Sequence, residues 1–305
     1  MKHHVNAPYR MGLSSGFTLV ELLVSIAIIT TITGLSLSAV HRIRGLSDRS
    51  KCHNNLRQIG LAFHDSHITN GFFPPGVASN LNNHRMPFAS WCVFLLPFLD
   101  QSMLWNQAKD AFQADPDFQH IPPHVGQKLV VPVFVCPSDA RIRHSQIVAE
   151  ERFERAFTSY LGVIGLNSSL KDGVLYIDSQ TSIKDITDGT SSTIMVGERP
   201  PSADLILGWW YAGWGQDRTG EGDMLLGTRT YNSGSNGLGC SSGPYKYMPG
   251  KIDNQCDAFH FWSLHEGGAT FLFCDGSVRH VSYAADLMLL IASTRAGAEP
   301  VSFSD

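Results

Sequence analysis

The longest apolar run in the chain lies close to its N-terminus and predicts a membrane-spanning helix. Residues 17–40, FTLVELLVSIAIITTITGLSLSAV, contain one charged residue, Glu21, and their other polar side chains are only serine and threonine. At about 1.5 Å per residue a helix over this run is roughly 36 Å long, which exceeds the ~30 Å hydrocarbon core of a bilayer. A buried helix of a soluble domain normally keeps a more polar face. We therefore expect residues 17–40 to anchor the chain in a membrane.

Beyond the apolar run, the pattern changes to that of an amphipathic helix. One apolar face has the spacing i, i+4, i+7, i+11 and comprises Cys52, Leu56, Ile59 and Phe63, while charged and amide side chains occupy the other faces. An Asn-Gly pair at 70–71 and the Pro-Pro-Gly run that follows predict the end of this helix. We expect residues 41–70 to form a stalk helix whose apolar face packs against a globular domain.

The rest of the chain, residues 71–305, has the pattern of a β-rich domain with many turns. Short β-branched and apolar runs bounded by Gly, Pro and Asp predict strands at 129–136, 160–164, 173–177, 192–196, 269–274 and 277–282, the first at a sheet edge because it contains a proline. Asp275-Gly276 between the last two strands suits a two-residue type I′ turn. A helix is expected at 100–112, and a short closing helix or strand at 286–292. The predicted fold class is α+β, with a long N-terminal helix packed on a mainly antiparallel β-rich domain.

The segment before the apolar run, residues 1–16, is a polar leader that contains Lys2 and Arg10 and ends in Gly16. An ordinary secretory signal is cleaved after its apolar run, whereas a cut after Gly16 leaves the helix on the mature chain. The sequence G|FTLVE resembles the prepilin leader of type IV pilins and type II secretion pseudopilins. The resemblance implies that a membrane-bound prepilin peptidase cuts after Gly16 and methylates the new N-terminus at Phe17, with Glu21 kept inside the helix.

Glu21 is expected to act in assembly with other pilin-like subunits or with further copies of this chain. A lone carboxylate in hydrocarbon costs several kcal/mol, so it needs a partner. In a filament the expected partner is the N-terminal ammonium group of a neighbouring subunit. Glu21 would then set the axial register of the subunits.

The basic residues near the apolar run, considered alone, predict that the long C-terminal part of the chain lies on the cytoplasmic side of the membrane. Lys2 and Arg10 precede the run, whereas the basic residues that follow it are Arg42, Arg44, Arg49 and Lys51. The positive-inside rule would therefore place the C-terminal part in the cytoplasm. The prepilin-like leader outweighs this count. We expect a single-pass protein of the cytoplasmic membrane whose globular domain lies in the periplasm or on the cell surface.

Charge and cysteine content limit the classes of function. The chain has 305 residues, with 23 Lys and Arg against 27 Asp and Glu, and no basic stripe of the kind that nucleic-acid binders carry. Six cysteines in an exported chain favour disulfides. The candidate pairs are Cys240 with Cys256, across a short Gly-rich loop, and Cys52 with Cys136, between helix and domain. For Cys92 and Cys274, which lie in apolar runs, buried thiols are an equal alternative.

Catalytic residue types occur near the C-terminus without a catalytic pattern. Ser263, His265 and Asp275 are the residue types of a hydrolytic triad, but Asp275 fits the hairpin turn and His265 fits a loop residue bonded to the backbone. The sequence contains no H-E-x-x-H motif. We expect no enzymatic activity and no required cofactor.

Two sets of residues have the chemistry of metal ligands. The set Cys256, His260, His265 and Cys274 has zinc-binding types, but its spacing matches no zinc module, and we assign no metal to it. The three carboxylates of a Gly-rich loop, Asp217, Glu221 and Asp223, are candidate ligands for calcium, although a solvated acidic loop is the simpler interpretation.

A loop-rich tract at 208–250 carries a dense group of aromatic residues, namely Trp209, Trp210, Tyr211 and Trp214. Packing within the domain is the favoured interpretation, and a stacking surface for glycan or another subunit is the alternative.

Six blocks of sequence together resemble the domain of unknown function 1559 family of prepilin-like proteins. In chain order they are CHNNLRQIGLAFHDSH, GFFPPG, SWCVFLLPFLDQ, FVCPSD, DITDGTSSTIMVGE and HEGGATFLFCDGSV. The last block holds His265, nine residues and then Asp275-Gly276, which is similar to the C-terminal signature of that family. The resemblance implies an envelope protein with a pilin-like N-terminus. Our leading hypothesis is a non-enzymatic pilin-like or pseudopilin-like subunit. The alternative is a surface binding module that uses the prepilin signal for export and contacts its ligand through the 208–250 tract.

Overall fold

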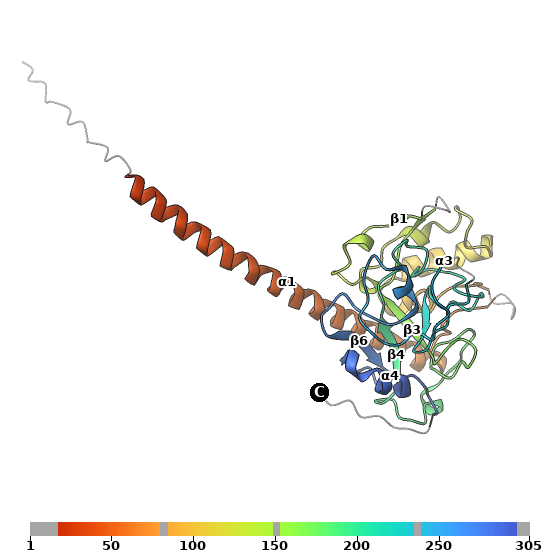
Figure 1. The fold of residues 1–305 in the computed structure, drawn as a ribbon. Coiled ribbons are helices and arrows are strands. Elements are labelled where there is room, and N and C mark those ends of the chain that lie inside the picture. The colour runs from red at the N-terminus through yellow and green to blue at the C-terminus, as the bar shows by residue number, and fades with distance from the viewer. Residues whose placement is uncertain (1–17, 80–84, 149–152, 235–238, 298–305) are drawn as a thin grey trace, which may run out of the picture. The chain divides into compact units, whose positions relative to one another are not determined.

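The computed structural model describes residues 18–79, 85–148, 153–234 and 239–297 (Figure 1). The proposed cleavage residues Gly16 and Phe17 lie outside these ranges. By its internal contacts the chain divides into two units, Met1–Leu46 and Ser47–Asp305.

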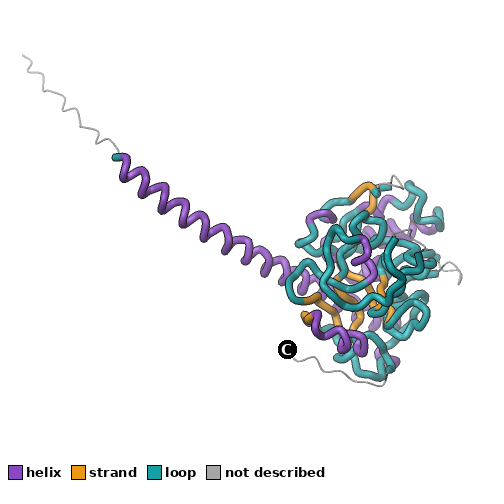
Figure 2. Tube along the Cα trace, in the orientation of Figure 1, coloured by secondary structure: helices purple, strands orange, loops and turns teal. Residues whose placement is uncertain are grey.

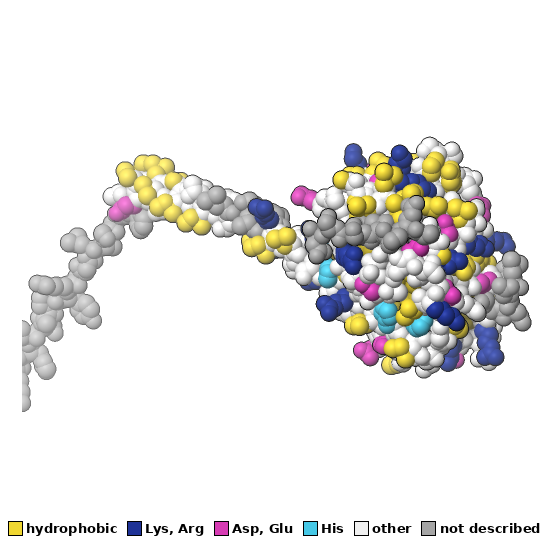
Figure 3. Space-filling view, turned by 90° about the horizontal axis from the view of Figure 1, so that it is seen from below, with side chains coloured by type: hydrophobic (Ala, Val, Ile, Leu, Met, Phe, Trp, Pro, Cys, Tyr) yellow, Lys and Arg dark blue, Asp and Glu magenta, His cyan; other side chains and the backbone are white. Residues whose placement is uncertain are grey.

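Helix α1, Leu19–Asn70, begins with a reciprocal cap between Thr18 and Glu21. The backbone N–H and the hydroxyl of Thr18 donate to Glu21 Oε2 at 2.9 and 2.8 Å, and the Glu21 N–H donates to Thr18 Oγ1 at 3.3 Å. This arrangement is a capping box, which satisfies N–H groups that the first turn of a helix leaves unpaired. Apolar side chains cover this end of α1 (Figure 3). Among the described residues, no helix is both long enough and apolar enough to cross a membrane.

The second unit incorporates the C-terminal part of α1 into its core. The predicted apolar face of this part is fully buried and comprises Cys52, Leu56, Ile59 and Phe63, which confirms the amphipathic prediction. Phe63 stacks on Trp91 with 5.4 Å between ring centroids and meets Phe73 edge to face at 6.2 Å. These ring contacts fix one face of α1 against the segment that follows it.

A five-stranded sheet forms the centre of this unit, in the order β5-β3-β4-β6-β7. The strands are β3 Tyr160–Gly165, β4 Ile194–Glu198, β5 Leu225–Gly227, β6 Gly268–Phe273 and β7 Val278–Ser282. Only the β3–β5 pair is parallel among these neighbours. A separate antiparallel pair joins β1 Gln146–Ile147 and β2 Glu154–Arg155. The α+β prediction is confirmed.

A hydrophobic core lies on each face of the sheet, and β3 contributes to both cores because successive side chains of a strand point to opposite sides. On β3, Tyr160 and Ile164 belong to the large core that contains Leu56 and Phe63 of α1. Leu161 and Val163 belong to a second core on the other side, which includes Leu289 of the short helix α4, Asp286–Ala292.

Irregular segments make up much of the remaining domain, as Figure 2 shows. The other helices are α2 Trp91–Leu95 and α3 Ser102–Ala114, and the 3-10 turns are η1 Leu96–Phe98, η2 Val125–Lys128, η3 Pro132–Phe134, η4 Ala140–Ile142, η5 Ile183–Asp185, η6 Gln255–Phe259 and η7 Tyr283–Ala285. Helix α3 lies within two residues of its predicted start and end.

Two predicted strands are wrong. The segment 129–136 contains the short turn η3 and no strand, because Pro132 fixes the first position of a 3-10 turn and has no N–H to donate to a sheet. The segment 173–177 lies beside β3 but forms no strand: the Gly173 N–H donates to Ile164 O at 2.7 Å and the Leu175 N–H to Val163 O at 3.2 Å. Ile177 forms only an isolated bridge, with Val77. A Cβ on Gly173 would lie 2.3 Å from the backbone of Gly165, so this close approach requires glycine.

The predicted β6–β7 hairpin is present, but its turn is not type I′. A type I′ turn needs a positive φ at both central residues, whereas here only Gly276 has one, at +83°. The Gly276 N–H donates to Phe273 O at 3.0 Å, and Asp275 Oδ1 accepts the Ser277 N–H at 2.8 Å. The connection is therefore a longer turn with a left-handed glycine before β7.

We predict that Phe63→Ala lowers the free energy of unfolding by about 3–5 kcal/mol, because it leaves a cavity among aromatic rings in the core. Leu61→Ala, on the exposed side of the same helix at 61% exposure, is the matched control and should stay within about 0.5 kcal/mol of wild type. Denaturant unfolding of the full chain, followed by tryptophan fluorescence, measures both. Equal losses would contradict the assignment of the buried face.

Candidate functional site

Glu21 is the one proposed assembly residue that the structure describes. Its carboxylate has a partner within its own chain, because Oε2 accepts hydrogen bonds from the backbone N–H and the hydroxyl of Thr18. The sequence analysis missed this role, although the spacing Thr-x-x-Glu directly before an apolar run is the signal of a capping box.

A second candidate site is a buried cluster of four side chains, which we call the Cys–Glu–His cluster: Cys52, Cys136, Glu198 and His265. One ligand-type atom of each lies within 4.8 Å of all the others, and all four residues are buried. His265 Nε2 lies 3.5 Å from Cys136 Sγ and 3.8 Å from Glu198 Oε1. Sulfur, imidazole and carboxylate, the ligand types of a transition-metal site, therefore face one another inside the domain.

Four separate segments supply the members of this cluster. Cys52 comes from α1, Cys136 from the loop after η3, Glu198 from the end of β4, and His265 from the loop before β6. Cys52 and Cys136 form a disulfide whose Cα atoms are 5.4 Å apart. This bond joins α1 to the loop after η3 in the same unit.

Local hydrogen bonds orient the other members. The Cys136 N–H donates to Ser159 Oγ at 2.9 Å, and the His265 N–H donates to Ser263 Oγ at 3.2 Å. The Thr270 N–H, from β6, donates to Glu198 Oε2 at 2.7 Å. The adjacent strands β4 and β6 thus position the carboxylate.

The other oxygen of Glu198 is the least satisfied atom of the cluster. Oε1 accepts no hydrogen bond from the described residues, although Glu198 is only 2% exposed. Burial raises the pKa of Glu198 to about 7, against the opposing effects of the Thr270 N–H, the hydroxyl groups of Ser263 and Thr270, and the charge of Arg49. Burial and the charge of Arg49 lower the pKa of His265. The same two effects lower the pKa of His280, on β7, to about 4. The cluster therefore favours a neutral imidazole and, below about pH 7, a protonated carboxyl group.

The second disulfide joins Cys240 to Cys256, with 5.5 Å between the Cα atoms. Both disulfides are pairs that the sequence offered as candidates. Cys92 and Cys274 are buried thiols, and burial raises the pKa of each well above its usual value.

The structure separates the residues of the hydrolytic triad. Asp275 lies in the turn at the far end of β6, where its N–H donates to Thr190 O at 3.0 Å, whereas His265 precedes the start of that strand. Gly276 likewise serves the turn. The two ends of the family signature thus have different roles, one in the hairpin and one in the Cys–Glu–His cluster.

The zinc set named from the sequence is also not brought together. Cys256 is in a disulfide, and His260 Nε2 lies 3.0 Å from Asp257 Oδ1. Only His265 of that set belongs to the cluster found among the described residues.

The interpretation of the loop at 217–223 as a solvated acidic loop is wrong for two of its three carboxylates. Glu221 and Asp223 are buried. Glu221 Oε1 accepts from the Thr230 hydroxyl at 2.7 Å, and Asp223 Oδ2 accepts from the Gly215 N–H at 2.8 Å. These carboxylates stabilise the fold of the tract, and only Asp217 is exposed.

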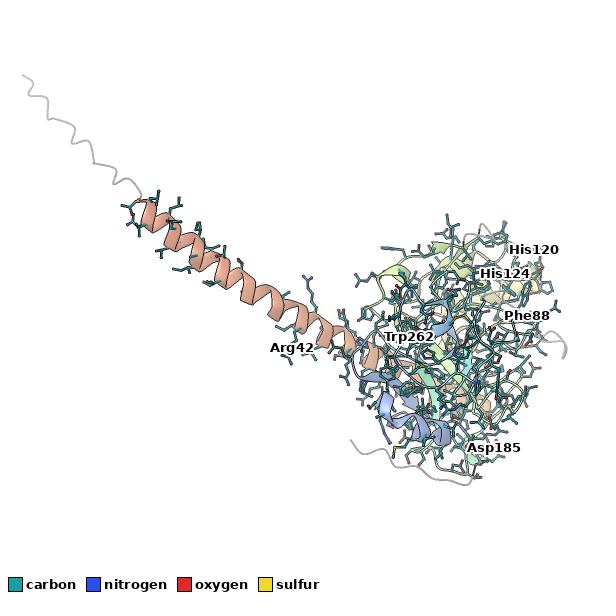
Figure 4. All side chains as sticks on the ribbon, in the orientation of Figure 1. Arg42, Phe88, His120, His124, Asp185 and Trp262 are labelled. Carbon is teal, nitrogen blue, oxygen red and sulfur yellow. A yellow bond between two sulfur atoms is a disulfide. The ribbon has the colours of Figure 1, made fainter. Side chains whose placement is uncertain are left out.

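Most of the aromatic group belongs to the core, as the favoured interpretation expected. Trp209, Trp210 and Tyr211 are buried, and Trp214 is 38% exposed. The Tyr211 hydroxyl lies 3.1 Å from Nδ1 of His124, one of the labelled residues in Figure 4. Three of the four rings of the alternative, a stacking surface for glycan or another subunit, are therefore buried and are not available to a ligand.

We predict a pH-dependent stability that is specific to Glu198 in the disulfide-bonded chain. Between about pH 4.5 and 7 the folded state keeps a proton that the unfolded state has lost, so the free energy of unfolding falls as pH rises, by about 3 kcal/mol in total. Glu198→Gln keeps an acceptor for Thr270 but cannot ionise. Denaturant unfolding from pH 4.5 to 7.5 should show wild type losing stability relative to this variant. A constant difference would contradict the raised pKa.

Comparison with known proteins identifies two parts of the chain. Residues 11–37 match the model of the prokaryotic N-terminal methylation motif, and residues 47–288 match the model described as protein of unknown function DUF1559. Searches of curated proteins and of solved structures gave no significant match. The first match is the signature of a prepilin-like, processed envelope protein, and the second covers most of the chain. The chain therefore belongs to the DUF1559 family and carries a prepilin-type N-terminus.

Proposed function

We propose that this chain is a non-enzymatic, membrane-anchored pilin-like subunit that assembles with itself or with other pilin-like proteins. The match of residues 11–37 to the methylation motif carries the proposal, because this motif is typical of processed, prepilin-like proteins and here overlaps the start of the apolar run. In this proposal residues 17–40 cross the cytoplasmic membrane once, and the globular domain lies in the periplasm or on the cell surface.

The apolar surface of α1 supports this anchoring. Leu22, Ile26 and Ile29 are each about half exposed or more, at 57%, 48% and 59%. Apolar surface of this extent is unfavourable in water and favourable against lipid chains or other apolar helices. The same surface therefore serves insertion in the bilayer and packing between subunits.

The disulfides support the proposed location of the domain. Disulfides persist in oxidising compartments outside the cytoplasm. This chain has two of them, and both lie in the second unit.

Mass spectrometry of the N-terminus of the native, membrane-extracted protein tests processing. The expected mature chain begins at N-methylated Phe17. An intact leader would overturn processing and would favour the alternative, a surface binding module that uses the leader only as a signal anchor.

A set of substitutions at the start of α1 tests assembly. If Glu21 sets register through its charge, both Glu21→Ala and Glu21→Gln should leave cleavage intact and prevent incorporation into high-molecular-weight assemblies. Crosslinking in intact cells, followed by size separation, measures incorporation.

Thr18→Ala is the control for the cap. It removes the hydrogen bonds between Thr18 Oγ1 and Glu21 but keeps the charge, with a loss of about 1 kcal/mol in helix stability. This variant should still assemble. Normal incorporation of Glu21→Gln would show that charge is not needed, and failure of Thr18→Ala alone would point to the cap.

A further inference from the structure

The Cys–Glu–His cluster has the composition of a metal centre as well as that of a disulfide with polar neighbours. We propose that this cluster binds Zn²⁺ when its two cysteines are thiols, so that the disulfide and the zinc complex are alternative states of one buried site. The site is independent of the assembly proposed above, because all four members belong to the second unit.

The distances between its members suit a tetrahedral ion. Zinc bonds of about 2.3 Å to sulfur and 2.1 Å to nitrogen place those two ligands about 3.6 Å apart in a tetrahedron. His265 Nε2 and Cys136 Sγ are 3.5 Å apart. The separation from His265 Nε2 to Glu198 Oε1, 3.8 Å, needs only a small closure, because the corresponding edge with zinc–oxygen and zinc–nitrogen bonds is about 3.4 Å.

Glu198 provides a second, independent reason. Its Oε1 accepts no hydrogen bond from any residue that the structure describes, lies inside the domain and faces the imidazole of His265. A buried oxygen without a donor is unfavourable, and a bound cation satisfies it. Thr270 holds the other oxygen, so the carboxylate is already oriented.

The charge of the loaded site is balanced by its surroundings. Two thiolates, one carboxylate, a neutral imidazole and Zn²⁺ carry a net charge of −1 by formal count. Arg49 lies one helical turn before Cys52 on α1, and its charge acts on both Glu198 and His265. Its positive charge stabilises an anionic complex.

Conversion between the two states requires a reductant, which we assign to the class of dithiols. A thiolate of the dithiol attacks one sulfur of the Cys52–Cys136 bond, and its second thiol then releases the mixed disulfide. Two electrons and two protons pass to the cysteines, and the dithiol becomes a cyclic disulfide. Zinc then displaces both protons from the two thiols into solvent.

The test measures zinc bound to the full chain in detergent, with and without prior reduction by a water-soluble phosphine. The phosphine reduces the disulfide with one water molecule and becomes the phosphine oxide. We expect about one Zn²⁺ per reduced chain and at least tenfold less per oxidised chain, by elemental analysis after dialysis. With Co²⁺ in place of zinc, thiolate-to-metal absorption should appear only in the reduced chain.

Matched variants locate the ligands. Cys136→Ser and His265→Ala should weaken zinc binding by at least about tenfold. Cys92→Ser, at a buried thiol outside the cluster, should bind like wild type. Zinc should also protect Cys52 and Cys136 of the reduced chain from alkylation, as peptide mass spectrometry measures.

Two results would overturn the proposal. One is a reduced, folded chain that binds no more zinc than the oxidised chain, and the other is unchanged zinc affinity in His265→Ala. If reduction alone unfolds the domain, zinc should restore its near-ultraviolet circular dichroism, because a ligand of the folded state stabilises that state. Failure of zinc to restore the signal would equally contradict the site.

Discussion

Burial of one face of α1 is the constraint on which the globular unit depends. Leu56, Ile59 and Phe63 have no exposed surface and belong to the same core as β3 and β6. A disulfide from Cys52 ties the same face to the loop after η3. The helix is therefore part of the domain, and a soluble version of the domain has to begin before Cys52, near Ser47, since a start at Gly71 removes these core side chains.

Periodic patterns predicted the elements in which one residue type repeats. The stripe on α1 followed from helical spacing, and β3, β4, β6 and β7 followed from short apolar runs bounded by turn residues. The two wrongly predicted strands, at 129–136 and 173–177, have local causes. Pro132 and Gly173 adopt backbone geometries that cannot be predicted from the apolar residues around them. Glu221 and Asp223 were misjudged for a related reason: sequence does not show which carboxylates accept backbone N–H groups inside a loop.

The Cys–Glu–His cluster shows where sequence reasoning ends. The sequence named its two cysteines as a pair and His265 as part of a signature, but it gave no reason to place Glu198 beside them. Glu198 ends a buried strand, and only the pairing of β4 with β6 brings it near His265. A separation of more than 60 residues between neighbouring members leaves no spacing to recognise. Each member does lie in a different block among those that carried the family resemblance, which is the one signal that links them.

The cap at the start of α1 uses only half of the Glu21 carboxylate. Both hydrogen bonds from Thr18 end on Oε2. A carboxylate has about four lone-pair sites on its two oxygens. In the proposed assembly, an ammonium group from another chain can bind Oε1 while the first turn stays intact. A subunit would then join its neighbours without first unwinding its own helix, and the same residue would serve the folded monomer and the assembled fibre at once.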